Sequence, residues 1–332
     1  MFGKTKSLFL FVISMLCLAS CDSIHEDLPR CELWLEFTFD YNMEYADAFN
    51  PQVKSVDVFV FGSDDKLLFS KRTETATLLD GNRMSLTDEL EFGNYKVLTV
   101  GNLSDKFWVS NNAGSEMVPG TTTLQQTVVS LKRETGVVNF DFQHLYFGEV
   151  VEVNHLPSNV GHEVYPVNLI RDTNRFNIAL MGYEGDEVNK MQYTFEIQAP
   201  ESAAYSWENE PTNQGPVTYI PYDVGPGEIS DVIVSARLNT MRLLNRSGWS
   251  YKFIIRNADT GSELWSYNLM TLLSIARPTS RYDGTDLPFQ EYLDRQSEWN
   301  LIFSIVEKPE GGFLQIGLVV GTWIYWLHDV EI

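Results

Sequence analysis

Polar and apolar residues alternate over residues 31–41, CELWLEFTFDY. Every odd-numbered position holds cysteine, leucine, phenylalanine or tyrosine, and four of the five even-numbered positions hold glutamate, threonine or aspartate. A period of two is typical of a β-strand with one face buried and the other in water. Further short β-type segments follow along the chain with Gly, Asn and Asp between them, and helical periodicity is almost absent. The pattern predicts an all-β fold of antiparallel β-sandwiches rather than an α/β fold.

The predicted strands are spread over the whole chain after residue 30. Besides 31–41 they lie in segments 53–61, 66–71, 92–102, 127–133, 136–142, 165–170, 174–180, 191–200, 230–238, 250–257, 298–307 and 312–332. Segment 269–276, LMTLLSIA, predicts one or two helical turns that end before Pro278. Segment 144–166 interrupts the rhythm with polar residues, two prolines and two glycines. The domain boundary is therefore expected there, with an N-terminal β-sandwich over 31–150 and a C-terminal one over 151–332.

The first 20 residues have the three parts of a secretory signal peptide. Lys4 and Lys6 precede an apolar run from Leu8 to Leu18, which is too short to cross a membrane as a helix. Small residues follow, and the ending LASC (18–21) is similar to a bacterial lipobox. The sequence predicts cleavage after Ser20 and acyl chains, palmitate among them, on Cys21. Residues 21–30 then form a lipidated tether, because two or more acyl chains anchor a protein stably.

The charge of the chain excludes one large class of partners. The formal net charge is −21, and removing residues 1–20, which carry two lysines and no acidic residue, makes it −23. Such a chain repels phosphate backbones, so nucleic-acid binding is not expected. An anionic lipid surface would repel it as well, which leaves the acyl chains as the anchor.

The residues that usually carry chemistry are few. Of three cysteines, Cys17 leaves with the signal peptide and Cys21 is acylated, so Cys31 is predicted to be a buried lone thiol, with pairing to another chain as the alternative. His155 and His162 flank LPSNVG without metal-site spacing and are interpreted as a solvated linker pair. No nucleophile, phosphate-binding or dinucleotide motif is present. The sequence predicts no enzyme, no cofactor and no metal site.

Several segments together resemble the fimbrillin-associated anchor lipoproteins of type V fimbriae in Bacteroidales. They occur in the family's order along essentially the whole chain: CDSIHEDLPRC with ELWLEFTFDY, VDVFVFGSDDKLLF, GNYKVLTVGN, LYFG, LIRDTNRFNIAL, QEYLDRQSEWNLIFSI and GTWIYWLHDVEI. The QEYLDR segment followed by an aromatic strand is the most specific of them. The resemblance implies two tandem transthyretin-like antiparallel β-sandwiches and a structural role.

The resemblance also implies a place and a set of partners. A protein of this family is held in the cell outer membrane by its lipid, lies at the cell surface with the fimbriae, anchors them at their base and limits their length. Its partners are pilin subunits, which join by strand pairing. The apolar end of the chain is the candidate strand for such pairing, with Trp323, Ile324, Trp326, Val330 and Ile332 as its interaction residues.

Two other functions remain open on the sequence alone. The first is a minor or tip fimbrial subunit, which would share the fold and the lipid. The second is a surface glycan-binding lipoprotein of a nutrient-uptake system, since eight tryptophans could line a sugar-binding face. Trp34, Trp265 and Trp299 lie in or beside predicted strands, however, where packing is the more common role.

Overall fold

The structure of the chain is a computed structural model that describes residues 31–156, 161–182, 193–200, 203–212, 214–226, 232–307, 313–320 and 323–327. The strands are β1 (Glu32–Thr38), β2 (Ser55–Phe61), β3 (Leu67–Glu74), β4 (Arg83–Ser85), β5 (Gly93–Gly101), β6 (Phe107–Asn111), β7 (Thr127–Leu131), β8 (Val137–Val138), β9 (Tyr146–His155), β10 (His162–Arg171), β11 (Thr173–Gly182), β12 (Tyr193–Ala199), β13 (Ala204–Ser206), β14 (Val217–Tyr219), β15 (Asp223–Gly225), β16 (Val232–Met241), β17 (Lys252–Asn257), β18 (Glu263–Asn268), β19 (Glu298–Glu307), β20 (Phe313–Val320) and β21 (Trp323–Trp326). The α-helices are α2 (Phe49–Gln52), α3 (Leu269–Ile275) and α4 (Phe289–Arg295), and short 3-10 turns span Thr75–Thr77 and Leu124–Gln126.

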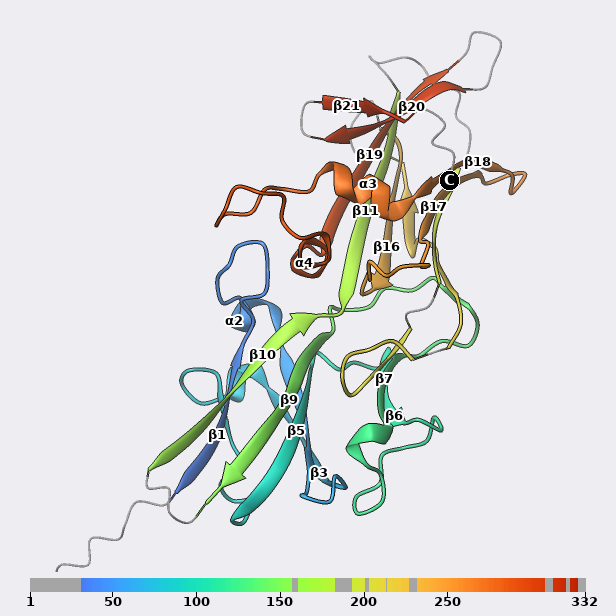
Figure 1. The fold of residues 1–332 in the computed structure, drawn as a ribbon. Helices are drawn as coiled ribbons and strands as arrows, with labels where there is room; N and C mark the ends of the chain where they lie inside the picture. The colour runs from blue at the N-terminus through green and yellow to red at the C-terminus, as the bar shows by residue number, and fades with distance from the viewer. Residues whose placement is uncertain are drawn as a thin grey trace, which may run out of the picture.

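The strands form four sheets, which confirms the all-β prediction. The orders are β3-β2-β5-β9-β10-β1-β4, β15-β16-β11-β19-β20-β21, β18-β17-β12-β14-β8 and β13-β7-β6. In Figure 1 the seven-stranded sheet occupies the lower part and the six-stranded sheet the upper part, and β10 leads into β11 between them. Most strand pairs are antiparallel as predicted, but β1–β10, β11–β19 and β14–β8 are parallel.

Strand β2 shows why the sheets stack in layers. All seven of its residues are buried, and in its second half apolar side chains occupy both faces of the strand. Phe59 and Phe61 belong to a large hydrophobic cluster that also contains side chains of β6 and β7. Val58 and Val60, on the other face, belong to a smaller cluster that contains side chains of β1 and α2. The turn after β2 includes Asp65 at φ 60°, and β2 and β3 pair antiparallel as a hairpin.

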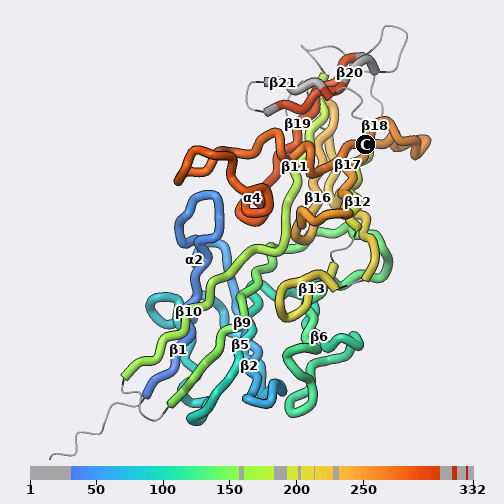
Figure 2. The backbone as a smooth tube through the Cα atoms, in the orientation of Figure 1, coloured from blue at the N-terminus to red at the C-terminus, as the bar shows by residue number. Residues whose placement is uncertain are grey.

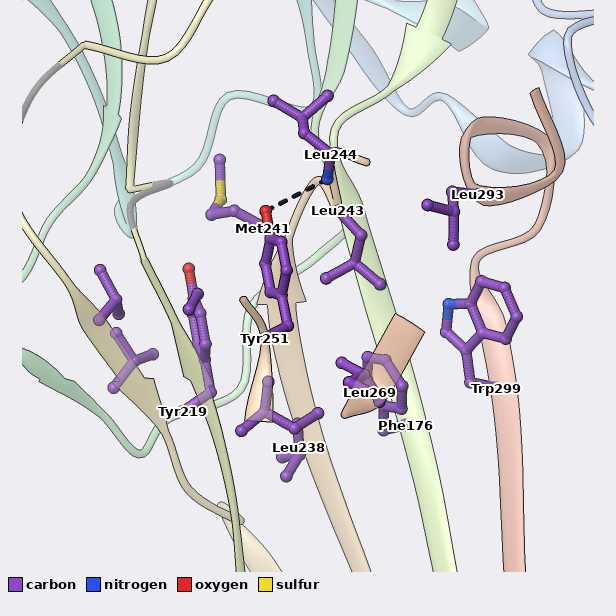
Figure 3. Close-up of a cluster of buried hydrophobic side chains, with 14 of the residues drawn as sticks. Phe176, Tyr219, Leu238, Met241, Leu243, Leu244, Tyr251, Leu269, Leu293 and Trp299 are labelled. Atoms are coloured by element: carbon purple, nitrogen blue, oxygen red, sulfur yellow. Dashed lines mark hydrogen bonds between the residues drawn. The ribbon is translucent and has the colours of Figure 1, made fainter. Parts of the chain in front are cut away.

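The larger cluster is continuous between the two parts of the molecule. It contains Phe61 of β2 together with Phe176 of β11 and Phe303 of β19. Figure 3 shows its upper region, where the side chain of Tyr251 lies among leucines and its hydroxyl oxygen accepts a hydrogen bond from the backbone N–H of Leu244 at 3.2 Å. The tube in Figure 2 follows the chain through both parts.

Three local predictions differ from the structure or are refined by it. Segment 144–166, expected to be irregular, contains β9 and the start of β10, because their outer faces tolerate polar residues. Segment 136–142 contributes only the two residues of β8. The helix predicted at 269–276 is α3, capped by Asn268, whose side chain accepts a hydrogen bond from the N–H of Thr271.

The division into two domains at residue 150 stays a prediction. β9 runs through that residue and lies in one sheet with β10 and β1. Strands β7 and β8 belong to the predicted N-terminal domain, and β13 and β14 belong to the C-terminal one. Because β7 pairs with β13 and β8 pairs with β14, two sheets contain strands from both predicted domains.

Asp172, between β10 and β11, makes the stability of the fold depend on pH. The residue is fully buried, and its Oδ1 accepts a hydrogen bond from Asn209 Nδ2 at 3.0 Å. Burial raises the pKa of Asp172 from 3.8 to about 6, although the positive charge of Arg242 opposes the shift. The folded state therefore holds the proton more tightly than the unfolded state. The contribution of Asp172 to stability is full below about pH 4 and is lost as the pH rises through about 6.

The Asp172→Asn substitution should remove this dependence. We expect the variant to gain about 1–3 kcal/mol in free energy of unfolding relative to wild type between pH 4 and pH 7.5, because two pKa units correspond to about 2.7 kcal/mol. Urea unfolding at the two pH values measures the gain. Asp105→Asn is the control, since that side chain is 81% exposed. A gain of equal size at both pH values would contradict the assignment to Asp172.

Candidate functional site

Strand β1 is an interior strand of the seven-stranded sheet. It pairs in parallel with β10, from Glu32↔His162 to Thr38↔Asn168, and antiparallel with β4. Four apolar side chains of segment 31–41 are fully buried: Leu33, Leu35, Phe37 and Phe39. Their burial contributes about 6–12 kcal/mol at about 1.5–3 kcal/mol each. The first strand therefore completes the sheet.

The two ends of segment 31–41 are less buried than predicted. Cys31 is half-buried because it lies at the open end of the sheet, where its Sγ donates a hydrogen bond to Glu163 Oε1 at 3.5 Å. Burial and the Glu163 carboxylate raise the pKa of this thiol. Tyr41, at the other end, is also half-buried, and its ring contacts an arginine from the far end of the chain.

This arginine–tyrosine contact consists of Tyr41, Tyr45 and Arg295. The guanidinium carbon of Arg295 lies 4.1 Å from the ring centroid of Tyr41 and 4.3 Å from that of Tyr45. Its Nη1 also donates a hydrogen bond to the backbone oxygen of Asn42 at 3.2 Å. Figure 1 shows the loop after β1 next to α4. Cation–π contacts strengthen when the cation is desolvated, and Arg295 is half-buried. Its contacts with the two tyrosines therefore connect the segment that contains the first strand to the C-terminal half of the chain.

Helix α4 is held in place from the other side by an ion pair. Arg242, just after β16, donates to Asp294 through Nε at 2.7 Å and Nη2 at 2.9 Å. Burial alone would lower the pKa of Arg242, but the hydrogen bonds to Asp294 together with the negative charges of Asp172 and Asp294 outweigh burial and raise it. Gln290 donates to the backbone oxygen of Leu243. Residues 290–295 are the QEYLDR segment, so this motif connects β16 to the loop after β1.

The predicted interaction strand lies at a sheet edge. β21 pairs antiparallel with β20, from Val320↔Trp323 to Gly317↔Trp326, and it is the last strand in the order of the six-stranded sheet. Trp323, Ile324 and Trp326 are therefore in an edge strand among the described strands. A row of backbone groups on such an edge can pair with another chain. Val330, Ile332 and the predicted lipid site Cys21 lie outside the described residues.

A family profile matches nearly the whole chain. The profile describes the fimbrillin-A associated anchor proteins Mfa1 and Mfa2, and it matches residues 28–329. The chain belongs to this family. The family's description as anchor proteins, and a solved structure 79% identical to this chain that is described as a putative adhesin, agree with the predicted fimbrial role. No helix among the described residues is long and apolar enough to cross a membrane.

Solved structures are similar to this anchor-family chain over most of its length. A "putative adhesin" from Bacteroides ovatus, whose crystal structure is known, shares 79% sequence identity with this chain. The two structures match with a TM-score of 0.87 over 94% of this chain and 100% of that one. The "putative polysaccharide binding proteins" of Bacteroides thetaiotaomicron are 27% identical with a TM-score of 0.72, covering 90% and 99%. The fimbrial anchor protein Mfa2 from Porphyromonas gingivalis, at 17% identity, shares the fold with a TM-score of 0.62, covering 90% and 99%. No curated protein matches the chain.

Proposed function

We propose that this protein is an outer-membrane lipoprotein that anchors fimbriae at their base, takes part in their assembly and limits their length. The observation that carries the proposal is the closed position of β1 between β10 and β4. A sheet that already contains its own strand at this position does not need a strand donated there by another subunit. The edge at β21 lets the subunit pair with a pilin. Because the subunit keeps β1, it has no open position there for a further subunit, so the fimbria ends at it, as it must at a base subunit.

The acyl chains on Cys21 hold the protein in the outer membrane, and residues 21–30 act as the tether. The body then stands at the cell surface beside the first pilin, with no enzymatic activity required of it. The family match supports a fimbrial role. The lipid and the membrane are proposed from residues 1–21 of the sequence.

Immunogold labelling of fimbriated cells tests the proposed position. We expect gold particles at fimbrial bases. Label along the shafts or at the tips would overturn the anchor role in favour of a minor or tip subunit. Label spread over the surface of cells that carry no fimbriae would instead favour glycan binding.

Deleting residues 323–332 should weaken the attachment of fimbriae. The deletion removes edge strand β21, which we propose as the strand-pairing surface for a pilin. We expect more fimbriae in the culture medium and altered fimbrial length by electron microscopy, while the seven-stranded sheet stays folded.

The opposite edge of the same sheet provides the control. Strand β15 is the other terminal strand, and Val224 in it is 50% exposed. Val224→Pro changes one edge position of the same sheet and should leave attachment unchanged. Fimbriae that stayed attached and of normal length on cells with the deletion would remove β21 from the proposed interface.

A further inference from the structure

Three side chains that commonly bind metal ions meet at the open end of the seven-stranded sheet. Cys31 directly precedes β1, His155 is the last residue of β9, and Glu163 is the second residue of β10. One thiol sulfur, one imidazole nitrogen and one carboxylate oxygen lie within 4.8 Å of one another. Cys31 and Glu163 are 132 residues apart in the chain, so the parallel pairing of β1 with β10 brings them together.

The separations between the ligand atoms suit a tetrahedral cation. Cys31 Sγ lies 3.5 Å from Glu163 Oε1, and His155 Nδ1 lies 3.1 Å from Glu163 Oε2. Zinc binds sulfur at about 2.3 Å and nitrogen or oxygen at about 2.0–2.2 Å, so tetrahedral ligand atoms stand about 3.3–3.6 Å apart. Both measured separations, one to each carboxylate oxygen of Glu163, are close to that range, and the three ligand atoms lie within 4.8 Å of one another, so a small adjustment of the side chains would bring all three to one ion.

The surroundings are those of a built site rather than a solvated cluster. The side chains of His155 and Glu163 are only 4% and 10% exposed. The ring of Phe92 lies 4.8 Å from the His155 ring, centroid to centroid, on the edge of the cluster. The hydroxyl of Tyr165, on the same side of β10 as Glu163, is held by hydrogen bonds to the backbone of Asn154.

His162, the other histidine that flanks residues 156–161, is not part of this cluster. Its imidazole is 59% exposed and pairs with Glu32 at 2.7 Å, and its ring stacks on Trp34. The interpretation of the two histidines as a solvated linker pair is therefore wrong for His155, which is buried at the end of β9.

We propose that Cys31, His155 and Glu163 bind a divalent cation of the zinc class, with water as the fourth ligand. A set of one sulfur, one nitrogen and one oxygen suits zinc, whereas calcium and magnesium take oxygen ligands. Coordination replaces the thiol S–H bond by a sulfur–metal bond, and the proton goes to solvent. The ion joins the start of β1 to β9 and β10. This site is independent of the proposed fimbrial function and goes beyond it.

Cobalt titration of the mature lipoprotein in detergent tests the site directly. The protein is reduced and freed of metal with a chelator, after which Co²⁺ is added. We expect one equivalent to give near-ultraviolet absorption from thiolate-to-cobalt charge transfer, and Zn²⁺ to abolish it. Zn²⁺, but not Mg²⁺, should also protect wild-type Cys31 from alkylation by iodoacetamide. This second measurement needs no variant.

Two variants test two of the ligands, and a third variant is the control. Cys31→Ser should lose the charge-transfer absorption, and Glu163→Gln should bind Co²⁺ at least tenfold more weakly. The matched control His162→Ala, one residue from Glu163, should bind within twofold of wild type. The proposal is overturned if wild type shows no charge-transfer absorption, or if Zn²⁺ leaves the alkylation of wild-type Cys31 unchanged.

Discussion

The Cys21→Ala substitution should release the whole protein body from the membrane. Residues 1–20 have the pattern of a secretory signal peptide, and the lipobox-like ending places the acyl chains on Cys21. Two or more acyl chains give stable anchoring, whereas the net charge of −23 that remains after removal of residues 1–20 and their two lysines offers an anionic surface no electrostatic attraction. We therefore expect all of the Cys21→Ala protein to move from the membrane fraction to the soluble fraction.

Membrane fractionation with a carbonate wash measures this change. Cys31→Ser is the matched control, because it removes a cysteine from the protein body and leaves the lipobox intact. That variant should remain in the membrane pellet with wild type. A Cys21→Ala protein that also stayed in the pellet would exclude the lipid anchor.

The second large effect concerns the first strand. We expect the mature, fimbria-associated protein to begin at acylated Cys21 and to retain residues 31–41. The resemblance to fimbrial subunits implies a processing step in related pilins, in which an arginine-specific protease removes the first strand and opens a groove for the next subunit. Here no arginine lies between Arg30 and Arg72. Cleavage at Arg30 would free the body from its lipid and leave β1 in place.

The energetics of β1 point the same way. The four fully buried side chains of segment 31–41, three of them in β1, contribute about 6–12 kcal/mol, which is comparable to the total stability of about 5–15 kcal/mol of a typical domain. The arginine–tyrosine contact adds a connection from Tyr41 and Tyr45 to Arg295. A protein that lost this strand without receiving another would be at the limit of folding.

Mass spectrometry of the protein purified with fimbriae decides between retention and loss. Peptides from residues 31–41 should be present at the same abundance as peptides from β11. An N-terminus at or beyond Asn42 would mean that the groove opens and that the protein extends the fimbria as a pilin.

The sequence by itself determined the fold class, most strands and the family. The alternation in 31–41, the two apolar faces of β2 and the turn at Asp65 are local features, and local features specify secondary structure. Helix α3 was predicted for the same reason, because its apolar spacing and Pro278 lie within a few residues of each other. The resemblance to the family was drawn from such local segments in the right order, and the family profile matches residues 28–329.

Only the tertiary structure decided which distant strands pair. The parallel pairing of β1 with β10 joins residues about 130 positions apart, and nothing in either strand's own pattern encodes its partner. The pairing of β9 with β5 and of β10 with both β9 and β1 placed most of the polar segment 144–166 in the sheet, and it brought Cys31 beside His155 and Glu163. The sequence alone did not indicate what the QEYLDR segment contacts. In the structure the segment lies in α4 and reaches its end, next to the loop after β1. Its side chains act through contacts with Arg242, Tyr41 and Tyr45, which come close only when the chain is folded.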